Sequence, residues 1–165
     1  MNYFELFEIP VQLSVNKSLL PARFFELSRR YHPDYFAGQG AEAQAEALEK
    51  TALLNKAYRT FQHPDETIRY VLQLKGLMEE EEKYELPPDF LMEVMEINEA
   101  LMEAEEEETR KKISSAIDEL AEQLYQPVAG IIEHYQEGIT TTGELLQVKE
   151  YYYKKKYIDR IREQL

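Results

Sequence analysis

A single proline between two helical stretches most limits how this chain can fold. Between residues 20 and 31, apolar side chains recur at steps of three and four, which is the spacing of one buried helix face. Pro33 has its φ fixed at about −65° and drives His32 out of helical geometry, so that helix must end there. Residues 41–62 are again rich in helix formers, with apolar positions about 3.5 residues apart. The pattern predicts an antiparallel helical hairpin with the proline at its tip.

The same His-Pro-Asp triplet occurs twice, at residues 32–34 and 63–65, so its identity alone decides nothing. The first copy follows a helical stretch and precedes a loop with two glycines. The second has no loop around it, because helical periodicity resumes at once and Pro64 suits the first position of a new helix, with Asp65 at its positive end. We therefore expect the first copy to be an exposed corner and the second to be a capping junction.

The helix before the first triplet has a basic face. Only Glu26 opposes four basic side chains on this stretch, which are Lys17, Arg23, Arg29 and Arg30. On an isolated helix, such a face is most simply a solvated surface. Next to an exposed corner, the same charge also suits an acidic partner.

Composition excludes several classes of function. The chain has 165 residues and no cysteine, which rules out disulfides, thiolate metal sites, a cysteine nucleophile and an iron–sulfur cluster held by the protein. The net charge of −13 argues against nucleic acid as a partner, because phosphate contacts need clustered lysine and arginine. The first residues lack the basic and apolar regions of a leader, and no apolar run approaches the length of a membrane span. We expect a soluble cytoplasmic protein with no membrane contact.

The charge is divided unevenly along the chain. Residues 1–76 hold nine basic and nine acidic side chains, whereas residues 77–165 hold ten basic and twenty-three acidic ones. The change follows Gly76 and coincides with a run of glutamates and a Pro-Pro pair. We predict one domain over residues 1–76, an acidic linker over 77–87 and a second domain over 88–165.

The second domain is predicted to contain three antiparallel helices joined by short turns. Pro127 interrupts the middle helix, where we expect a kink or a break, with Ile131 still on the core face. In the last helix, periodicity turns Leu165 inward and leaves Tyr152 partly outside.

The first of these three helices has more apolar residues than one buried stripe requires. Phe90, Val94, Ile97 and Leu101 suffice for that stripe. The surplus apolar residues and the carboxylates beside them are Leu91, Met92, Met95, Glu96, Glu99 and Glu103. Such a strip suits an apolar and basic partner. Equally, neighbouring helices could wrap this helix on two sides.

No catalytic motif is present. The sequence has no glycine-rich phosphate loop, no Gly-x-Ser-x-Gly elbow and no His-Glu-x-x-His zinc motif. Its acidic runs lack the ordered ligand spacing of a calcium loop. We therefore expect no enzyme activity, no metal site and no cofactor.

The N-terminal pattern resembles a J domain, the module of DnaJ-type co-chaperones. The resemblance rests on the basic helix, the Tyr31-His32-Pro33-Asp34 motif, the short loop and the alanine-rich helix that follows, and it covers residues 1–76. In that family, the motif and the basic helix bind a DnaK-type chaperone and stimulate its ATP hydrolysis. The resemblance thus implies a chaperone-binding site made of Arg23, Arg29, Arg30, His32, Pro33 and Asp34.

Further stretches resemble the HscB family along nearly the whole chain. They are residues 3–7, 53–58, 63–64, 69–72 and 90–93 together with Glu96. HscB proteins are all-α and L-shaped, and their C-terminal three-helix domain holds the iron–sulfur scaffold protein IscU for delivery to a DnaK-like partner, HscA. The resemblance implies a client-binding surface of Leu91, Met92, Met95, Glu96, Glu99, Glu103 and Tyr153.

Two residues depart from the family pattern. Tyr35 stands where J domains usually have a lysine or arginine, which removes a positive charge beside the motif, and Pro127 falls within the middle C-terminal helix. Two other functions remain open from the sequence. One is a J-domain adaptor for a different client, and the other is a helical structural protein in which the corner is only a turn.

Overall fold

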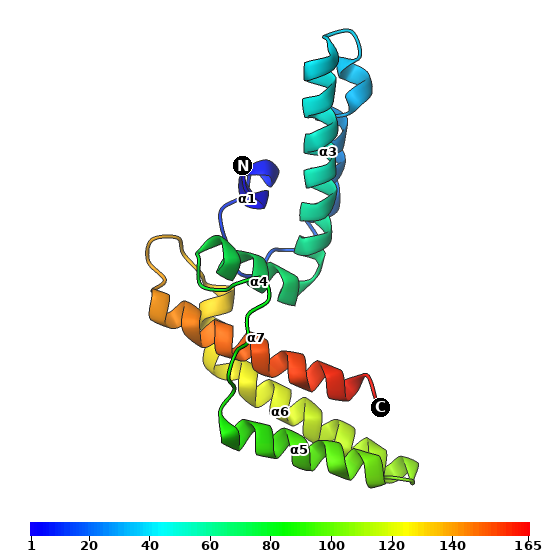
Figure 1. Ribbon diagram of the computed structural model, residues 1–165, viewed down its shortest axis with the longest axis vertical. Helices are drawn as coiled ribbons and strands as arrows, with labels where there is room; N and C mark the ends of the chain where they lie inside the picture. Colours follow the sequence, from blue (N-terminus) through cyan, green and yellow to red (C-terminus); the bar gives the residue numbers. More distant parts are fainter. The chain divides into compact units, whose positions relative to one another are not determined.

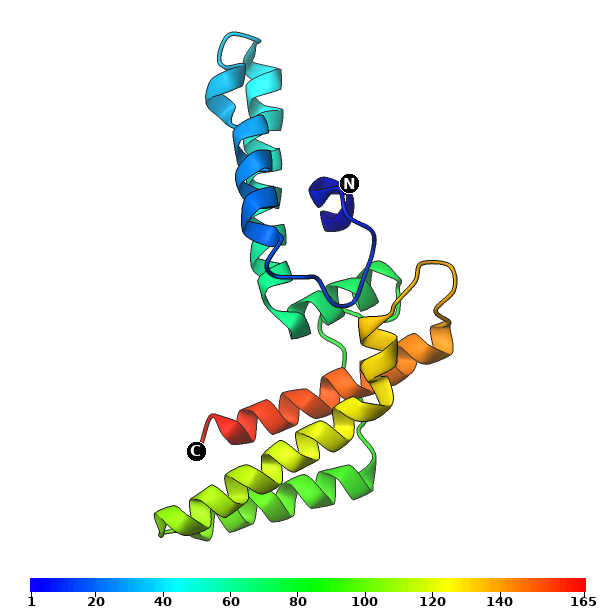
Figure 2. The same ribbon diagram turned by 180° about the vertical axis from the view of Figure 1, so that it is seen from behind.

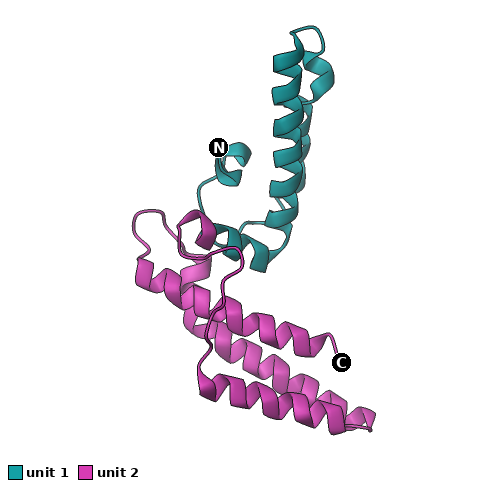
Figure 3. Cartoon of the chain, in the orientation of Figure 1, with its two compact units in different colours: residues 1–71 teal, residues 72–165 magenta.

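The computed structural model describes all residues from 1 to 165. It contains seven α-helices, one 3₁₀ turn and no β-strand, which confirms the predicted all-α class. The chain divides into two compact units, residues 1–71 and 72–165 (Figure 3). The division falls within helix α4 (Pro64–Leu74), a few residues before the boundary that the change of charge suggests.

The first unit is built on a helical hairpin. Its complete helices are α1 (Tyr3–Phe7), α2 (Leu20–Arg30) and α3 (Ala41–Gln62). Helices α2 and α3 lie side by side and run in opposite directions (Figure 1). Leu27 and Leu54 are fully buried, and the rings of Phe24 and Tyr58 stack with centroids 4.2 Å apart. Each of the two buried leucines contributes about 1.5–3 kcal/mol to holding the hairpin closed, and the half-buried Phe24 and Tyr58 contribute less.

An aromatic cluster fixes α1 against the other end of α3. The ring of Phe61 lies 5.0 Å from that of Phe4 and 5.2 Å from that of Phe7. Tyr3 stacks on Tyr70 at 4.2 Å, and the backbone N–H of Tyr3 donates to the Tyr70 hydroxyl at 2.9 Å. Burial raises the pKa of Tyr70. This short helix would be marginal alone, so its position depends on these contacts.

The second unit is the predicted three-helix bundle. Its helices are α5 (Pro88–Glu103), α6 (Glu107–Glu133) and α7 (Thr142–Arg162), which lie side by side (Figures 1 and 2). Its main core consists of Leu86, Phe90, Val94, Leu101, Ile117, Leu120, Ile158 and Ile161. A capping box opens α7: the Thr141 hydroxyl accepts from the Glu144 N–H at 3.1 Å, and the Glu144 carboxylate accepts from the Thr141 N–H at 3.0 Å.

Pro127 does not break α6, which continues as one helix to Glu133. Figure 2 shows this helix changing direction in its last turns. Proline has no N–H to donate to the preceding turn, which loosens the helix at that point. The buried positions beyond it are Val128 and Ile132, and Ile131 is only half-buried. The predicted core position was therefore wrong by one residue.

Two predictions for α7 were also wrong. Tyr152 is buried, with its ring edge-to-face against Tyr153 at 5.2 Å, whereas Leu165 is 46% exposed. Leu165 lies beyond the end of the helix at Arg162, so helical periodicity no longer determines which way it points.

The acidic stretch between Gly76 and α5 packs within the second unit. Met78 and Leu86 are buried. Glu82 forms an ion pair with Lys149 of α7 at 2.7 Å, and Tyr84 stacks on Tyr153 of the same helix. The segment expected to be a linker therefore lies along the bundle.

A second polar contact joins the end of α4 to the loop between α6 and α7. Lys75 pairs with Glu137, whose carboxylate also accepts from the Tyr135 hydroxyl at 2.6 Å. These hydrogen bonds, the one from Lys75 first, lower the pKa of Glu137. The pKa of Lys75 is raised for the same reason.

We predict that Glu137→Gln lowers the free energy of unfolding at pH 7 by about 0.5–1 kcal/mol, because the half-exposed pair is screened by water. A carboxylate with a lowered folded-state pKa stabilises the fold above its ordinary value of 4.5, and this contribution is lost as the pH falls through the folded-state pKa. Urea denaturation should therefore separate the two proteins at pH 7, and the difference should shrink as the pH is lowered below 4.5. Glu119→Gln, at an exposed position without an ion pair, is the control.

Candidate functional sites

The first His-Pro-Asp triplet forms an exposed corner, as predicted. Helix α2 ends at Arg30, and His32 has extended backbone angles of φ −62° and ψ 129°. Pro33 then opens a single 3₁₀ turn, Pro33–Phe36, where a plain loop was expected. The side chain of Asp34 is 86% exposed and that of His32 is 53% exposed.

One hydrogen bond determines which nitrogen of His32 carries the proton. The backbone N–H of Asp34 donates to the His32 Nδ1 at 3.2 Å. Because Nδ1 accepts that bond, the proton of the neutral ring is on Nε2. The corner thus offers a partner one N–H donor on His32 and the exposed carboxylate of Asp34, whose Oδ2 lies 3.6 Å from the His32 Nδ1.

The corner is fastened to α3 at Tyr31. The Thr51 hydroxyl lies 3.2 Å from the Tyr31 carbonyl and 2.8 Å from the Ala47 carbonyl of its own helix, so its one hydrogen is shared between them, and the Lys50 ammonium lies 5.0 Å from the Tyr31 ring centroid. The first contact satisfies a carbonyl left open where α2 ends. The exposed side chains of the corner therefore stand on a fixed backbone.

The second triplet is a junction, as predicted. His63 is the last residue before α4, and Pro64 is the first residue of that helix. Thr67 is only 1% exposed, and its hydroxyl lies 3.0 Å from the Thr60 carbonyl and 3.1 Å from that of His63. These bonds hold the ends of the two helices together and leave no loop at the triplet.

The basic face of α2 is partly neutralised within the chain. Arg30 donates to Glu8 at 2.8 Å and to Glu26 at 3.2 Å, and Arg23 pairs with Glu8 at 3.3 Å. Glu8 is the largest cause of the raised pKa of Arg30. The sequence did not indicate Glu8 as a partner, because it lies far from both arginines along the chain and meets them only when α1 packs beside α2.

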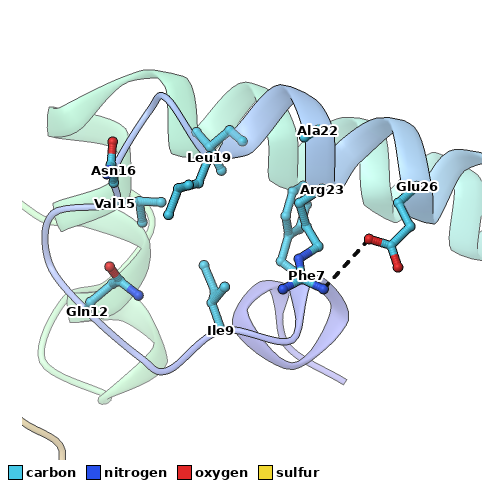
Figure 4. A pocket seen from close by; sticks show the side chains of 10 residues that line it. Phe7, Ile9, Gln12, Val15, Asn16, Leu19, Ala22, Arg23 and Glu26 are labelled. Atoms are coloured by element: carbon cyan, nitrogen blue, oxygen red, sulfur yellow. Dashed lines mark ion pairs between the residues drawn. The ribbon is translucent and has the colours of Figure 1, made fainter.

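Arg23 and Glu26 also line a pocket of about 350 Å³ between α2 and the segment that follows α1. Figure 4 shows Arg23 reaching across from α2 towards α1, with its ion pair to Glu26 drawn as a dashed line. Phe7, Ile9 and Leu19 line the apolar part of this pocket.

Arg29 is the only one of the three predicted arginines without an ion pair. Its guanidinium lies 5.8 Å from the ring centroid of Phe25, which is 65% exposed. Tyr35 is 63% exposed and lines the same shallow depression. The outer face of the hairpin near the corner therefore combines the exposed rings of Phe25 and Tyr35 with the guanidinium of Arg29, which forms no ion pair within the chain.

The predicted strip on α5 is exposed over most of its length. Met92 and Met95 are 63% and 60% exposed, and Glu96, Glu99 and Glu103 are exposed beside them. Leu91 is half-buried and packs against the bundle core. The alternative in which neighbouring helices cover these residues is therefore wrong for the methionines and carboxylates.

Met102 also belongs to this surface, although it was not among the residues predicted for the strip. Met102 is 77% exposed and lies seven residues, or two helical turns, after Met95 on the same edge of α5. The signal was available, because steps of four and three from Met95 lead through Glu99 to Met102. We call Leu91, Met92, Met95 and Met102, with the three glutamates, the α5 strip.

Tyr153 is half-buried and lies under a second aromatic ring. Its ring is parallel to that of Tyr84, with centroids 4.6 Å apart, and both pack against the same core as Leu91. Burial is the largest cause of the raised pKa of Tyr84, followed by the charges of Glu150 and Glu82. Tyr84 is thus a further member of this region that spacing alone did not reveal.

Comparison with known proteins assigns the chain to a family. Residues 86–165 match the family described as the HSCB C-terminal oligomerisation domain. The co-chaperone protein HscB homolog of Vibrio vulnificus is 36% identical over 134 residues, which cover 81% of this chain and 78% of that protein.

Solved structures agree with this assignment. The crystal structure of the human co-chaperone protein HscB has a TM-score of 0.78 with this chain at 30% sequence identity, over 99% of this chain and 79% of the human one. The chaperone HscB from Vibrio cholerae has a TM-score of 0.74 at 28% identity, over 98% and 94% of the two chains.

The fold and these matches define a co-chaperone. The chain belongs to the HscB family. None of its helices combines the length and apolar character that a membrane crossing requires.

We predict that Thr67→Val lowers the free energy of unfolding by about 0.5–1.5 kcal/mol. Valine matches the shape of threonine and removes only the hydroxyl that bridges the two helix ends. Both carbonyls keep a backbone donor, so the loss stays at the size of an ordinary hydrogen bond. Urea denaturation measures the change, and Thr109→Val, at an exposed position, is the matched control. An equal effect of the two substitutions would contradict the bridging role of Thr67.

Proposed function

We propose that this chain brings a client protein to a DnaK-type chaperone and stimulates the ATP hydrolysis of that chaperone. The observation that carries the proposal is the exposed His32 and Asp34 pair on a backbone fastened at the tip of an antiparallel hairpin. By the family resemblance, the chaperone is similar to HscA and the client is an iron–sulfur scaffold protein similar to IscU.

The chaperone contact uses the corner and the outer face of α2. The Nε2–H of His32 and the carboxylate of Asp34 supply directional polar contacts, and Arg29 adds a positive charge beside Phe25 and Tyr35. Binding that is tighter to the ATP-bound conformation shifts the chaperone towards the hydrolysing state, because a ligand moves an equilibrium only by its difference in affinity for the two states.

The client contact uses the α5 strip together with Tyr153. Flexible methionine side chains adapt to an apolar partner, and the three glutamates suit basic side chains around it. Since one chain carries both contacts, a bound client is presented to the chaperone at a high effective concentration. The co-chaperone itself performs no chemistry and needs no cofactor.

We predict that His32→Gln reduces the stimulation of a cognate DnaK-type ATPase by at least about tenfold, because it removes the ring donor and the acceptor for the Asp34 N–H. Binding of the scaffold protein should be unchanged. His63→Gln is the matched control, since the second triplet is a junction between helices. Steady-state ATP hydrolysis measures the effect. A larger loss in His63→Gln than in His32→Gln would show that the second triplet, not the first, stimulates the chaperone.

We predict that combining Met92→Ala with Met95→Ala weakens scaffold binding about ten- to thirtyfold, because each exposed side chain loses apolar area that a partner would bury. Stimulation of the chaperone without client should be unchanged. Ile139→Ala, an exposed apolar residue outside the α5 strip, is the control. Isothermal titration calorimetry with the scaffold protein measures the affinity. An unaltered affinity of the double variant would show that the α5 strip does not bind the client.

A further inference from the structure

Glu8 adopts a backbone conformation that glutamate rarely takes. It has φ 58° and ψ 42°, in the left-handed region, and it is the only residue other than glycine with a positive φ. Its N–H closes the last turn of α1 on the Glu5 carbonyl at 3.1 Å. Glycine adopts this conformation without steric cost, whereas in any other residue the Cβ crowds the backbone and raises the free energy of the folded chain. A glutamate at this position therefore suggests a side-chain role that glycine could not fill.

That side chain bridges the two arginines of α2. One carboxylate oxygen lies 2.8 Å from Arg30 and the other 3.3 Å from Arg23, while Glu26 also contacts both arginines. Two positive and two negative charges thus form a closed, half-exposed network. Arg23 and Arg30 are residues through which a J domain would meet an acidic chaperone surface.

We infer that Glu8 competes with the chaperone for Arg23 and Arg30 and thereby limits how tightly the chain docks. The inference rests on the proposed function. An acidic partner gains less from these guanidinium groups while Glu8 is in place, because Glu8 occupies part of their donors and offsets part of their positive charge. Glu8 therefore lowers the affinity of the chain for the chaperone through its contacts with Arg23 and Arg30, without itself contacting the chaperone.

A purely structural role does not account for Glu8. The alternative is that its ion pairs serve only to attach α1 to α2. However, Phe4 and Phe7 are 1% and 0% exposed in the aromatic cluster around Phe61, and Tyr3 is held by Tyr70. Helix α1 is thus already fixed by apolar contacts, which are worth more than exposed ion pairs.

The test compares Glu8→Gln with Glu5→Gln. Both remove one negative charge from the same short stretch, and Glu5 is exposed and contacts Asn2, not the arginines. The measurement is the concentration of co-chaperone that half-saturates stimulation of a DnaK-type ATPase, at low and at high salt. We expect Glu8→Gln to lower this concentration about three- to tenfold at low salt, because Arg23 and Arg30 then keep only Glu26 as an ionic partner and carry an excess of positive charge. We expect the difference to shrink at high salt, since salt screens exposed charges, and Glu5→Gln to match the wild-type chain.

Glu8→Gly provides a second variant that folds readily, because glycine suits the left-handed conformation. It should shift the half-saturating concentration in the same direction as Glu8→Gln. Circular dichroism and urea denaturation establish that each variant is folded.

The possible results separate the two proposals. If the wild-type chain stimulates hydrolysis and the two Glu8 variants match Glu5→Gln, the competing role of Glu8 is wrong and the proposed function stands. Weaker docking of folded Glu8 variants would likewise overturn the inference, since Glu8 would then contribute to docking itself. If the wild-type chain stimulates no DnaK-type chaperone, the proposed function fails and the inference fails with it.

Discussion

The first unit depends on the exclusion of His32 from helical geometry by Pro33. Because α2 has to stop there, its last carbonyls need new partners, and Thr51 supplies a donor to the Tyr31 carbonyl. The chain can then return as α3 alongside α2, with Phe24 stacked on Tyr58. A backbone constraint at one residue thus produces a hairpin whose tip has a defined backbone conformation although its side chains are exposed. Such preorganisation reduces the ordering that a partner would otherwise have to impose.

Local features of the fold could be predicted from the sequence. The bounds of α3 followed from an uninterrupted helical pattern between Gly40 and the second triplet. The different roles of the two triplets followed from whether a loop surrounds them. The exposed methionines of α5 followed from the number of apolar residues beyond one core stripe. In each case the decisive information lies within about one or two helical turns of the residue concerned.

What could not be predicted depends on side chains that are distant along the sequence. Nothing near Glu8 indicates its two arginine partners, and nothing near Tyr84 indicates that its ring will cover Tyr153. The error at Ile131 has a different origin, because Pro127 alters the helix that carries the pattern while the residues after it still look periodic. Periodicity reports which face of a helix is apolar, and it does not report where a bend redirects that face.

The methionines on α5 also determine how this surface responds to oxidants. A thioether oxidises to a sulfoxide, which is polar and no longer suits an apolar partner. Because Met92, Met95 and Met102 are all more than half exposed, oxidants reach them directly, whereas Met78 in the same unit is buried and protected. Oxidation would therefore convert an apolar surface into a polar one without loosening the helices beneath it, and reduction of the sulfoxides would restore it.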